Sequence, residues 1–472
     1  MTMERRTRDH LGDGQAMKPL RIGNGCGFWG DNLDAPRELA EKGALDYLTL
    51  EYLAELTLSI LALQRQRNAE AGYATDFLDV LQSLVPLLKD QPHLKIVTNA
   101  GGMNPAGCGA RARAVLDQAG LKDRSVAIVA GDDLMPRLDA LMAAGCLFAN
   151  LDTGEPLSAV RSRVVSANAY LGARPLVDGL RQGASVIVTG RVADASLTLA
   201  PAVHELGWKW DDWDRLACGT AAGHLIECGA QATGGLWCNW REAGDLAHVG
   251  YPIAQIETDG SFLLTKPAGT GGAVNRETVS EQLLYEVGDP AAYLTPDVVA
   301  DFTTIQLTER GRDVVHLANT HGKPATDSYK VSIAYRDGYG ASGTLVIAGP
   351  SAVAKARRCG EIVLERLRRA GASPQHAHVE VLGAGECVPG AALVDPPEVV
   401  LRVAVRDDRR AVVERFTKEL APLVTSGPPG VTGYTTGRPV VREVFAYWPS
   451  LVPKDAVAPE VRVMSRFASK VP

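Results

Sequence analysis

Residues 20–31 of the chain read LRIGNGCGFWGD, and this stretch decides the fold class. A short apolar run leads directly into closely spaced glycines, which is the pattern of a buried strand that ends in a tight turn. Similar apolar runs recur up to about residue 207, and stretches with helical periodicity separate them. This alternation predicts βαβ units, and therefore a mostly parallel sheet with helices on both faces.

The expected elements follow that alternation. Strands are predicted at residues 20–23, 45–51, 94–98, 126–130, 146–150 and 185–189. Helices are predicted at residues 36–42, 76–89, 110–119, 133–143 and 169–181. Beyond residue 250 we expect strands at 253–258 and 304–307, a hairpin turn at Asp337-Gly338, and helices at 351–369 and 409–420.

These patterns predict two domains, as is usual for a chain of 472 residues. We expect a flexible tail at residues 1–17, a Rossmann-like α/β domain at 18–245 and an α+β domain at 246–472. The predicted fold class is therefore α/β, with helices on both faces of the N-terminal sheet.

Composition and charge argue against several classes of partner. The formal net charge is −6, whereas a protein that binds nucleic acid needs a concentrated positive surface. No apolar run approaches the roughly 20 residues that span a bilayer, and the first residues lack the apolar segment of a signal peptide. The eight cysteines are scattered without a CxxC pair, which favours a reducing compartment. We therefore expect a soluble cytoplasmic protein that binds neither nucleic acid nor membrane.

Polar, glycine-rich loops follow several of the predicted strands. In an open parallel sheet, ligands bind beyond the carboxyl ends of the strands, where glycine lets the backbone approach and polar side chains orient the ligand. Glu51 directly follows the second strand. The candidate site residues in the other loops are Asn24, Gly25, Gly27, Asn99, Gly101, Gly102, Arg191 and Asp194.

Gly25, Gly27 and Gly30 also match the dinucleotide fingerprint GxGxxG. That fingerprint must open directly into a helix, whose N-terminus then faces the pyrophosphate. Here Asp31 follows at once, where it would repel phosphate, and the helix is predicted to begin only near Pro36. The pattern therefore favours a tight turn over a nicotinamide or flavin site.

A second glycine-rich loop, TKPAGTGG at residues 265–272, precedes a helix with Thr278 and Glu281 in capping-box spacing. Such a loop can hold a carboxylate or phosphate through backbone N–H groups, with a lysine as counter-charge. The predicted contacts are Lys266, Thr270, Gly271 and Gly272. The lysine precedes the glycines, so the Walker A order of a kinase or ATP-dependent ligase is absent. A plain connecting loop has the same composition, and both interpretations stay open.

The predicted helix at residues 223–233 places four polar side chains on one face. His224, Glu227, Cys228 and Gln231 have the spacing i, i+3, i+4 and i+7, and apolar residues cover the rest of the helix. Burial can tune acid–base groups toward neutral pKa values, so Glu227 is a candidate general base and His224 a candidate acid, with Gln231 as a substrate contact. A solvated stripe or a satisfied core network gives the same pattern. No second ligand cluster accompanies His224 and Glu227, so no metal is expected.

Eight motifs occur in order along the chain. They are IGNGCGFWGD at 22–31, DYL at 46–48, EYLAE at 51–55, TNAGGMNP at 98–105, TGRVAD at 189–194, ECGAQ at 227–231, KPAGTGG at 266–272 and QLLYE at 282–286. Together they resemble the acyclic terpene utilisation (AtuA) family, from about Lys18 onward. The resemblance implies a role in the degradation of citronellol-like terpenoids, where chemistry proceeds on branched acyl-CoA thioesters.

The resemblance also implies a partner. Some family members look like fusions to a small C-terminal ferredoxin-fold domain, which this sequence does not show after Trp448. We therefore expect a small ferredoxin-fold AtuA-like protein to act in trans. A homo-oligomer, dimeric or tetrameric, is also expected, because such assemblies are common among cytosolic enzymes.

Residues and resemblance together favour an enzyme that adds or removes water, or an acidic proton, beside a carboxyl or thioester carbonyl. In this hypothesis Asn99 polarises the carbonyl, Glu227 or Asp194 moves the proton, and Arg191 and Lys266 hold an anionic group. No bound cofactor is required, and CoA enters only as part of the small anionic substrate. The alternative is a non-catalytic binding or scaffold subunit that a small partner completes. The hypothesis requires these residues to meet around a shared cavity.

Overall fold

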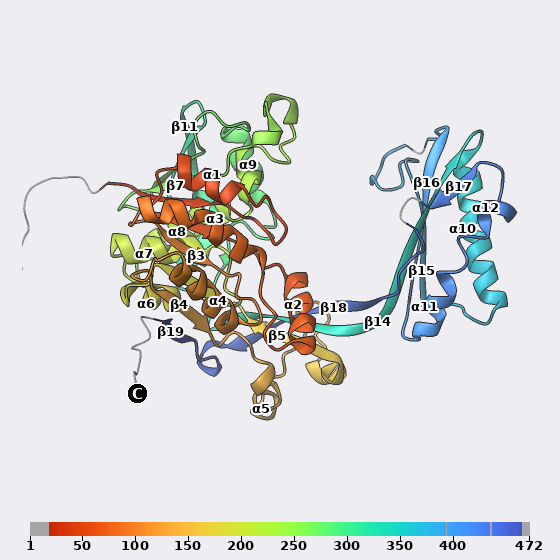
Figure 1. Cartoon of the computed structure of the whole chain (residues 1–472), viewed down its shortest axis with the longest axis horizontal. Coiled ribbons are helices and arrows are strands. Elements are labelled where there is room, and N and C mark those ends of the chain that lie inside the picture. The colour runs from red at the N-terminus through yellow and green to blue at the C-terminus, as the bar shows by residue number, and fades with distance from the viewer. Residues whose placement is uncertain (1–17, 393, 435–436, 465–472) are drawn as a thin grey trace, which may run out of the picture. The chain divides into compact units, whose positions relative to one another are not determined.

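The computed structural model describes residues 18–392, 394–434 and 437–464, and Figure 1 follows the chain through its elements. The chain forms two compact units. Unit 1 comprises Met1–Leu157, Ser166–Ile333 and Pro449–Pro472, and unit 2 comprises Ser158–Val165 and Ala334–Trp448. This division differs from the predicted boundary between residues 245 and 246, because strands beyond residue 250 pair with the first sheet. The tail predicted at residues 1–17 lies outside the described residues.

Unit 1 is an α/β structure built on a large mixed sheet, whose described strands run in the order β11-β12-β8-β7-β1-β2-β3-β6-β4-β19. Their bounds are β1 (Leu20–Asn24), β2 (Tyr47–Leu50), β3 (Lys95–Thr98), β4 (Val126–Ala130), β6 (Val186–Thr189), β7 (Ile253–Ile256), β8 (Phe262–Thr265), β11 (Gln306–Gly311), β12 (Val314–Ala318) and β19 (Glu460–Met464). The neighbours β1, β2, β3, β6 and β4 are parallel, as the alternating pattern predicts. The remaining strands add antiparallel edges on both sides.

Nine α-helices of unit 1 are described, and proline in the first turn starts several of them, because its fixed φ suits a helix and its missing N–H costs no bond there. Their bounds are α1 (Ala35–Lys42), α2 (Glu55–Arg67), α3 (Asp76–Asp90), α4 (Pro105–Gln118), α5 (Leu138–Ala143), α6 (Arg174–Arg181), α7 (Ser196–Leu206), α8 (Trp213–Glu227) and α9 (Arg276–Leu284). A small sheet of β9 (Tyr293–Leu294), β10 (Val299–Asp301) and β13 (His321–Lys323) also belongs to unit 1. Within the described ranges, no helix combines the length and apolarity that a bilayer crossing requires.

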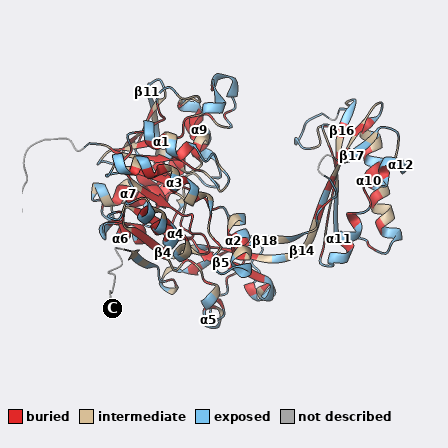
Figure 2. Cartoon of the chain, viewed as in Figure 1, coloured by how far each residue is buried: buried red, intermediate tan, exposed pale blue. Residues whose placement is uncertain are grey.

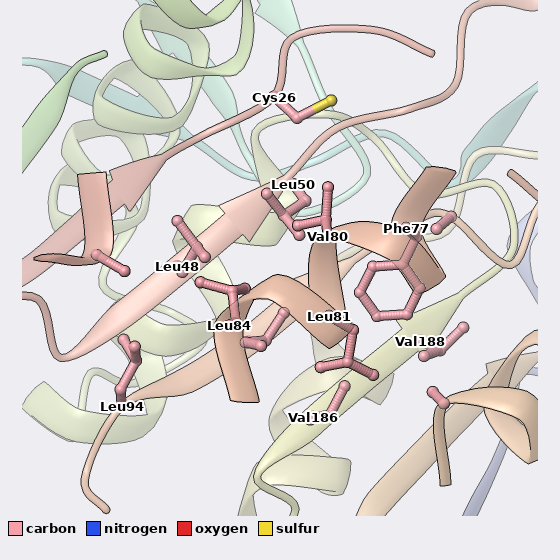
Figure 3. Packing of buried hydrophobic residues seen from close by; sticks show 14 of the residues in the cluster. Cys26, Leu48, Leu50, Phe77, Val80, Leu81, Leu84, Leu94, Val186 and Val188 are labelled. Atoms are coloured by element: carbon pink, nitrogen blue, oxygen red, sulfur yellow. The ribbon is translucent and has the colours of Figure 1, made fainter. Parts of the chain in front are cut away.

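One hydrophobic core of unit 1 lies where α3 packs on the parallel strands (Figure 3). Phe77, Leu81 and Leu84 repeat at helical spacing on the inner face of α3, and Leu48 and Leu50 meet them from β2. Full burial of each such side chain contributes about 2 kcal/mol. Figure 2 shows buried residues concentrated along the sheet and on the inward faces of its helices. This packing fixes the ends of the strands from which the polar loops emerge.

The strand predicted at residues 146–150 does not form. Phe148 has a φ of +46°, and the Asn150 side chain accepts hydrogen bonds from two following backbone N–H groups, so the chain turns there. The strand of this region is instead β5 (Val164–Ala169), which pairs with β14 (Ser328–Ala348) outside the parallel sheet.

The hairpin predicted at Asp337-Gly338 is also wrong, because β14 continues through both residues. Tyr339 pairs with Asp407 on β16 (Glu398–Asp407), which keeps the chain extended beyond the pair. The Asp337 carboxylate accepts a hydrogen bond from Arg406, which also lies on β16. Cross-strand pairing thus overrides a local turn preference.

Unit 2 is an antiparallel sheet in the order β15-β16-β14-β17, covered by helices. Besides β14 and β16, its elements are α10 (Ala352–Arg369), β15 (His376–Leu382), α11 (Arg410–Phe416), α12 (Leu423–Ser426) and β17 (Val431–Tyr434). β18 (Arg442–Pro453) pairs with β14. Apart from the short α12, the chain order is βαββαβ, and each neighbouring pair along the sheet is antiparallel, as in the split βαβ motif.

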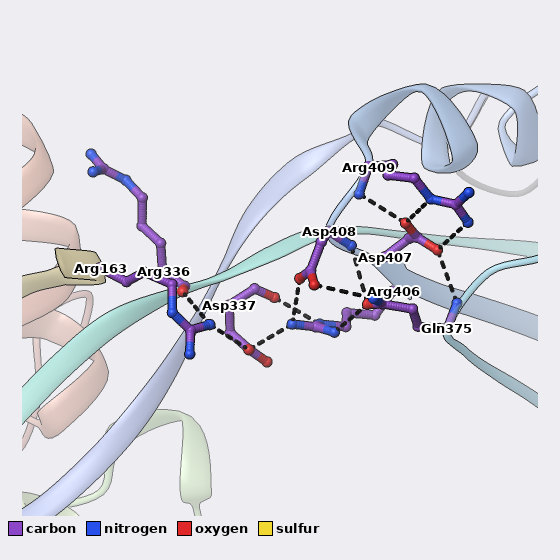
Figure 4. Close-up of polar contacts among 8 residues, drawn as sticks. All are labelled: Arg163, Arg336, Asp337, Gln375, Arg406, Asp407, Asp408 and Arg409. Carbon is purple, nitrogen blue, oxygen red and sulfur yellow. Dashed lines mark hydrogen bonds and ion pairs between the residues drawn. The ribbon is translucent and has the colours of Figure 1, made fainter. Parts of the chain in front are cut away.

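A polar network joins the end of β16 to neighbouring segments of unit 2 (Figure 4). The Asp407 carboxylate accepts hydrogen bonds from the backbone N–H and guanidinium of Arg409 and from the backbone N–H of Gln375. Arg406 bonds to Asp337 and Asp408. Both oxygens of Asp407 are therefore paired, although its side chain has no exposed surface.

Candidate functional site

Three neighbouring parallel strands, β2, β3 and β6, carry polar residues just beyond their carboxyl ends. Glu51 follows β2, Asn99 follows β3, and Arg191 is the second residue after β6. The last turn of α8 adds His224 and Glu227. Because the strands lie side by side, residues far apart in sequence meet at one edge of the sheet.

Arg191 is the centre of this group. Its Nη1 donates to the carbonyl of Leu53 at 2.6 Å, and its Nη2 donates to Oδ1 of Asp194 at 2.6 Å. The guanidinium carbon lies 4.1 Å from the centre of the Tyr170 ring, a cation–π arrangement. Its backbone N–H donates to Asp132 at 2.8 Å. Only 2% of the Arg191 side chain is exposed, so the residue is a buried positive charge rather than a surface clamp.

Asn99 positions Glu51. Its Nδ2 donates to Oε1 of Glu51, and its Oδ1 accepts from the backbone N–H of Tyr52 at 2.8 Å. Both ends of the Asn99 amide are therefore engaged within a fully buried residue. The expected role of Asn99 in polarising a substrate carbonyl does not fit this geometry, because the amide faces Glu51. Burial, with the nearby charge of Asp194, raises the pKa of Glu51 well above its usual value.

Asp194 combines accessibility with a raised pKa. The surrounding protein, together with the negative charges of Glu227 and Glu55, raises the pKa of Asp194 to about 7, although Arg191 opposes this shift. Nevertheless 35% of the Asp194 side chain is exposed. Protein atoms thus surround a carboxyl group that keeps part of its surface exposed. Such a group exchanges protons near neutral pH, as general acid–base catalysis requires.

His224 and Glu227 share a proton. His224 Nε2 faces the backbone carbonyl of Gln282 at 3.1 Å, an acceptor, so this nitrogen carries hydrogen. Nδ1 faces Oε1 of Glu227 at 3.2 Å, so either the imidazole is doubly protonated or the carboxyl is protonated. Burial lowers the pKa of His224, but Glu227 outweighs it and the net pKa is raised.

The surroundings of His224 define its role. Only 2% of the His224 side chain is exposed, and both ring nitrogens are occupied within the protein. Its ring packs against Tyr293 and Phe302, with centroids 5.2 and 5.4 Å away. His224 therefore cannot reach a substrate directly, contrary to the predicted role as acid. It orients Glu227 and shares a proton with it. Of the Glu227 side chain, 10% is exposed.

Three buried polar atoms of this group have no hydrogen-bond partner within the described part of the chain. They are Oε2 of Glu51, Nε of Arg191 and Oε2 of Glu227. Unpaired buried polar atoms are rare in folded proteins, because each costs about 1–3 kcal/mol. Their occurrence on three residues of one group is typical of a site that a ligand completes.

Three further residues surround the group, and sequence reasoning missed them. The Tyr170 hydroxyl donates to Glu55 at 2.5 Å, and Lys330 lies 3.4 Å from the same carboxylate. Although burial alone would raise it, the hydrogen bond from Tyr170 and the charge of Arg191 lower the pKa of Glu55 to about 2. Glu55 and Glu51 lie in the quoted EYLAE motif, whereas nothing near Tyr170 or Lys330 in sequence marked them.

Two predicted contacts have other functions or lie elsewhere. Asn24 donates from Nδ2 to the carbonyls of Ile226 and Glu227 at 2.7 and 2.8 Å, and so caps the C-terminus of α8. Gln231 leaves the predicted helical stripe, because α8 ends at Glu227 and a 3₁₀ helix, η4 (Gly229–Thr233), follows. The left-handed φ of +58° at Gly229 interrupts the α-helical period.

The predicted substrate-binding glycines serve close backbone packing. A Cβ on Gly27 would collide with the backbone of Cys228, and one on Gly101 would collide with the carbonyl of Thr189. Glycine therefore lets the polar loops lie close to α8 and β6. Protein atoms also crowd the Cβ positions of Gly25, Gly102, Gly271 and Gly272.

Lys266 does not join the group after β2, β3 and β6. Its Nζ donates to the carbonyl of Thr270 at 2.9 Å and lies 3.3 Å from Asp313, and only 3% of the side chain is exposed. Thr270 bonds back to the carbonyl of Pro267 at 2.7 Å. The lysine charge is thus used to close its own loop, which corrects its expected role as an anion holder. The N-cap of the neighbouring α9 is Asn275, whose capping box is completed by Thr278 rather than by the predicted pair.

Within the described ranges, no group of three or more His, Cys, Asp or Glu side chains has an arrangement suited to a metal. Cys26 and Cys108 are buried, and burial raises the pKa of both thiols. A thiol held protonated is a poor nucleophile.

The family model described as "Acyclic terpene utilisation family protein AtuA" matches residues 20–463. The chain belongs to the AtuA family. A search of curated proteins finds no match.

Two solved structures are weakly similar to this AtuA-family chain. One is an amidase of the hydantoinase/carbamoylase family from Burkholderia vietnamiensis, with 15% identity over 25% of this chain and 29% of that one, and a TM-score of 0.16. The other is a provisionally assigned amidohydrolase/peptidase from Burkholderia cenocepacia, with 20% identity over 25% of this chain and 30% of that one, and a TM-score of 0.16. The chain thus covers less than a third of either structure.

Proposed function

We propose that this AtuA-family chain is a hydro-lyase-type enzyme of branched-chain or terpenoid acyl catabolism, acting beside the carbonyl of an acyl-CoA or hydroxy acid. The observation that carries this proposal is Asp194: an accessible carboxyl with a pKa of about 7, bonded to Arg191 and electrostatically coupled to Glu227. We treat the five parallel strands as a Rossmann-like core, because ligands of such sheets bind beyond the strand carboxyl ends.

The reaction we infer divides two proton transfers between two groups. The Asp194 carboxylate removes the proton on the carbon next to the carbonyl. The proton shared by His224 and Glu227 passes from Glu227 to the hydroxyl on the following carbon as the C–O bond breaks, so that water and an enoyl product leave. Hydration is the reverse. After the reaction Asp194 carries one extra proton, and the pair of His224 and Glu227 lacks one. Release of a proton from Asp194 and uptake of one by the pair restore the starting state.

Arg191 supplies electrostatic stabilisation in this scheme. Negative charge develops on the carbonyl oxygen when the neighbouring carbon loses its proton. A buried, permanently charged guanidinium can stabilise that charge through its electric field without contacting the substrate, because its orientation is already fixed by Leu53, Asp194 and Tyr170. CoA enters only as part of the substrate, and the free cysteines are in keeping with a cytoplasmic location.

Solvent deuterium exchange tests the proposal. The purified chain is incubated in D2O with a branched 3-hydroxyacyl-CoA or enoyl-CoA, and label at the carbon next to the carbonyl is read by mass spectrometry. We expect exchange by the wild type and by Asp407→Asn, and exchange slowed by about 10²- to 10⁴-fold in Asp194→Asn. Equal exchange by wild type and Asp194→Asn would contradict the assignment of the base.

A second candidate is a non-catalytic subunit that a small ferredoxin-fold AtuA-like protein completes. The unpaired atoms of Glu51, Arg191 and Glu227 favour it, because a partner's side chains can satisfy them as well as a substrate can. The same exchange assay, run with and without the co-expressed neighbour, separates the two. Ligand binding without exchange in either preparation would favour the scaffold.

A further inference from the structure

Unit 2 carries a basic cavity that the proposed function does not use. An open cavity of about 510 Å³ lies between the C-terminal part of α10 and the end of α11 with the segment that follows it. Its walls are Arg366, Arg369, Ala370, Arg415, Lys418, Glu419 and Pro422. Four of these residues are cationic and one is a carboxylate, although the whole chain has a formal net charge of −6. Positive charge is therefore concentrated against the overall trend.

Two of the four cations are neutralised by neighbours. Arg415 lies 2.7 Å from Glu419, whose side chain is only 6% exposed. Arg369 lies 2.7 Å from Glu365, which also holds Arg368. These pairs need no ligand.

Arg366 and Lys418 are different, since no carboxylate partner is found for either within the described residues of unit 2. Arg366 donates from Nη2 to the hydroxyl of Ser426 at 2.8 Å. Its Nη1 is buried without a hydrogen-bond partner in the described chain. A buried guanidinium N–H without an acceptor is unfavourable, so the charge of Arg366 is only partly satisfied beside the cavity.

Helix electrostatics explain only part of this arrangement. Cations in the last turn of a helix stabilise its C-terminal carbonyls, which accounts for a basic residue at each of Arg366, Arg368 and Arg369 at the end of α10. That effect places charge toward solvent at the helix end. It does not account for a buried, unpaired nitrogen on Arg366, or for the convergence of Arg366 with Lys418 from another segment.

We propose that this cavity, defined by Arg366 and Lys418, is a binding site for a small phosphate-bearing anion. A guanidinium matches phosphate oxygens through directed N–H groups, and a lysine adds a compact positive charge. The Arg366 guanidinium, which bonds only to the neutral Ser426 hydroxyl among the described residues, gains an anionic partner when phosphate binds. The site lies wholly within unit 2 and is independent of the chemistry proposed at Asp194.

Calorimetric titration of the full chain with inorganic pyrophosphate and, separately, inorganic phosphate tests the site. We expect saturable binding that weakens as salt rises, and a roughly tenfold or greater loss of affinity in Arg366→Gln and in Lys418→Gln. Arg358→Gln is the matched control, because Arg358 lies on α10 outside the cavity and pairs with Glu361. It is expected to bind like the wild type. Wild-type affinity in Arg366→Gln, or no saturable binding of either anion by the wild type, would overturn the site.

A second measurement does not depend on the variants folding. Phenylglyoxal labels accessible arginines of the wild type, and peptide mass spectrometry reads each position. Pyrophosphate is expected to protect Arg366 and Arg415 while leaving Arg358 labelled at an unchanged rate. Equal labelling of Arg366 with and without pyrophosphate contradicts the proposal. Protection by anionic lipid vesicles or by RNA, but not by pyrophosphate, would overturn the small-anion assignment in favour of a macromolecule.

Discussion

Two aspartate–arginine pairs in this chain behave in opposite ways. In unit 2, the hydrogen bonds from Arg409 and from backbone N–H groups lower the pKa of Asp407 to about 2. In unit 1, burial and the negative charges of other carboxylates raise the pKa of Asp194 to about 7, despite a 2.6 Å hydrogen bond from Arg191. The two carboxylates differ in how many of their oxygen atoms accept hydrogen bonds from the protein. A satisfied carboxylate stabilises the fold, whereas an under-satisfied one near neutrality is available for chemistry.

Substitution of the two aspartates should give the largest contrast. Asp194→Asn removes the proposed base, and we expect a loss of 10²- to 10⁴-fold in the exchange rate, the usual contribution of acid–base catalysis. Asp407→Asn should stay within about twofold of the wild type, because Asp407 belongs to a structural network (Figure 4). Exchange rates from mass spectrometry measure both. A large loss in Asp407→Asn alone would reverse the assignment of the two pairs.

His224→Gln should have a smaller effect, about tenfold on the exchange rate, because His224 positions Glu227 without touching substrate. The distinguishing measurement is the pH profile. Without His224 the shared proton is lost, so the limb of the profile that reports the proton donor should move while the limb that reports Asp194 stays near pH 7. A uniform loss at all pH values would indicate a purely structural role.

Stability should depend on pH with opposite sign at the two sites. The pKa of Asp407 is depressed, so its contribution to stability is present above pH 3.8 and is lost as pH falls through about 2. The pKa of Asp194 is raised, so its contribution is present below pH 3.8 and is lost as pH rises through about 7.

Thermal unfolding of the two Asn variants checks these signs. At pH 7, Asp407→Asn should lower the unfolding free energy by about 1–2 kcal/mol. Asp194→Asn should be more stable than the wild type at pH 8, and this gain should shrink between pH 7 and pH 4. The same pH trend for both variants would contradict the comparison.

The smallest effect is expected at Lys266. Its charge closes its own loop, so Lys266→Ala should leave ligand affinity and exchange within about twofold while lowering stability by about 1–3 kcal/mol, since Asp313 would lose its buried partner. Calorimetric titration with a branched 3-hydroxyacyl-CoA measures the affinity, and thermal unfolding measures the stability. A tenfold loss of affinity without loss of stability would restore Lys266 to the site.

Much of the sheet could be predicted from sequence, because buried parallel strands read as short apolar runs bounded by glycine. β1, β2, β3, β4 and β6 all fall within or overlap their predicted ranges. The predicted hairpin at Asp337-Gly338 failed, because the pairing of β14 with β16 connects residues far apart in sequence and is invisible to local patterns.

The candidate site was predictable only in part. Arg191, Asp194, Glu227 and His224 were found because each lies at a strand end or on a polar helix stripe. What sequence could not show is which polar groups are already satisfied. Asn99 and Lys266 carry the right chemistry but face Glu51 and Asp313, and only the folded chain reveals that.

The titration of Asp194 tests the central claim most directly. Selective 13C labelling of aspartate carboxyl carbons, with Asp194→Asn to assign the resonance, gives its pKa by NMR in the full chain. We predict a midpoint near pH 7 for Asp194 and one near pH 2 for Asp407 in the same spectra. An Asp194 resonance that titrates near the ordinary aspartate value of about 4 would contradict the account.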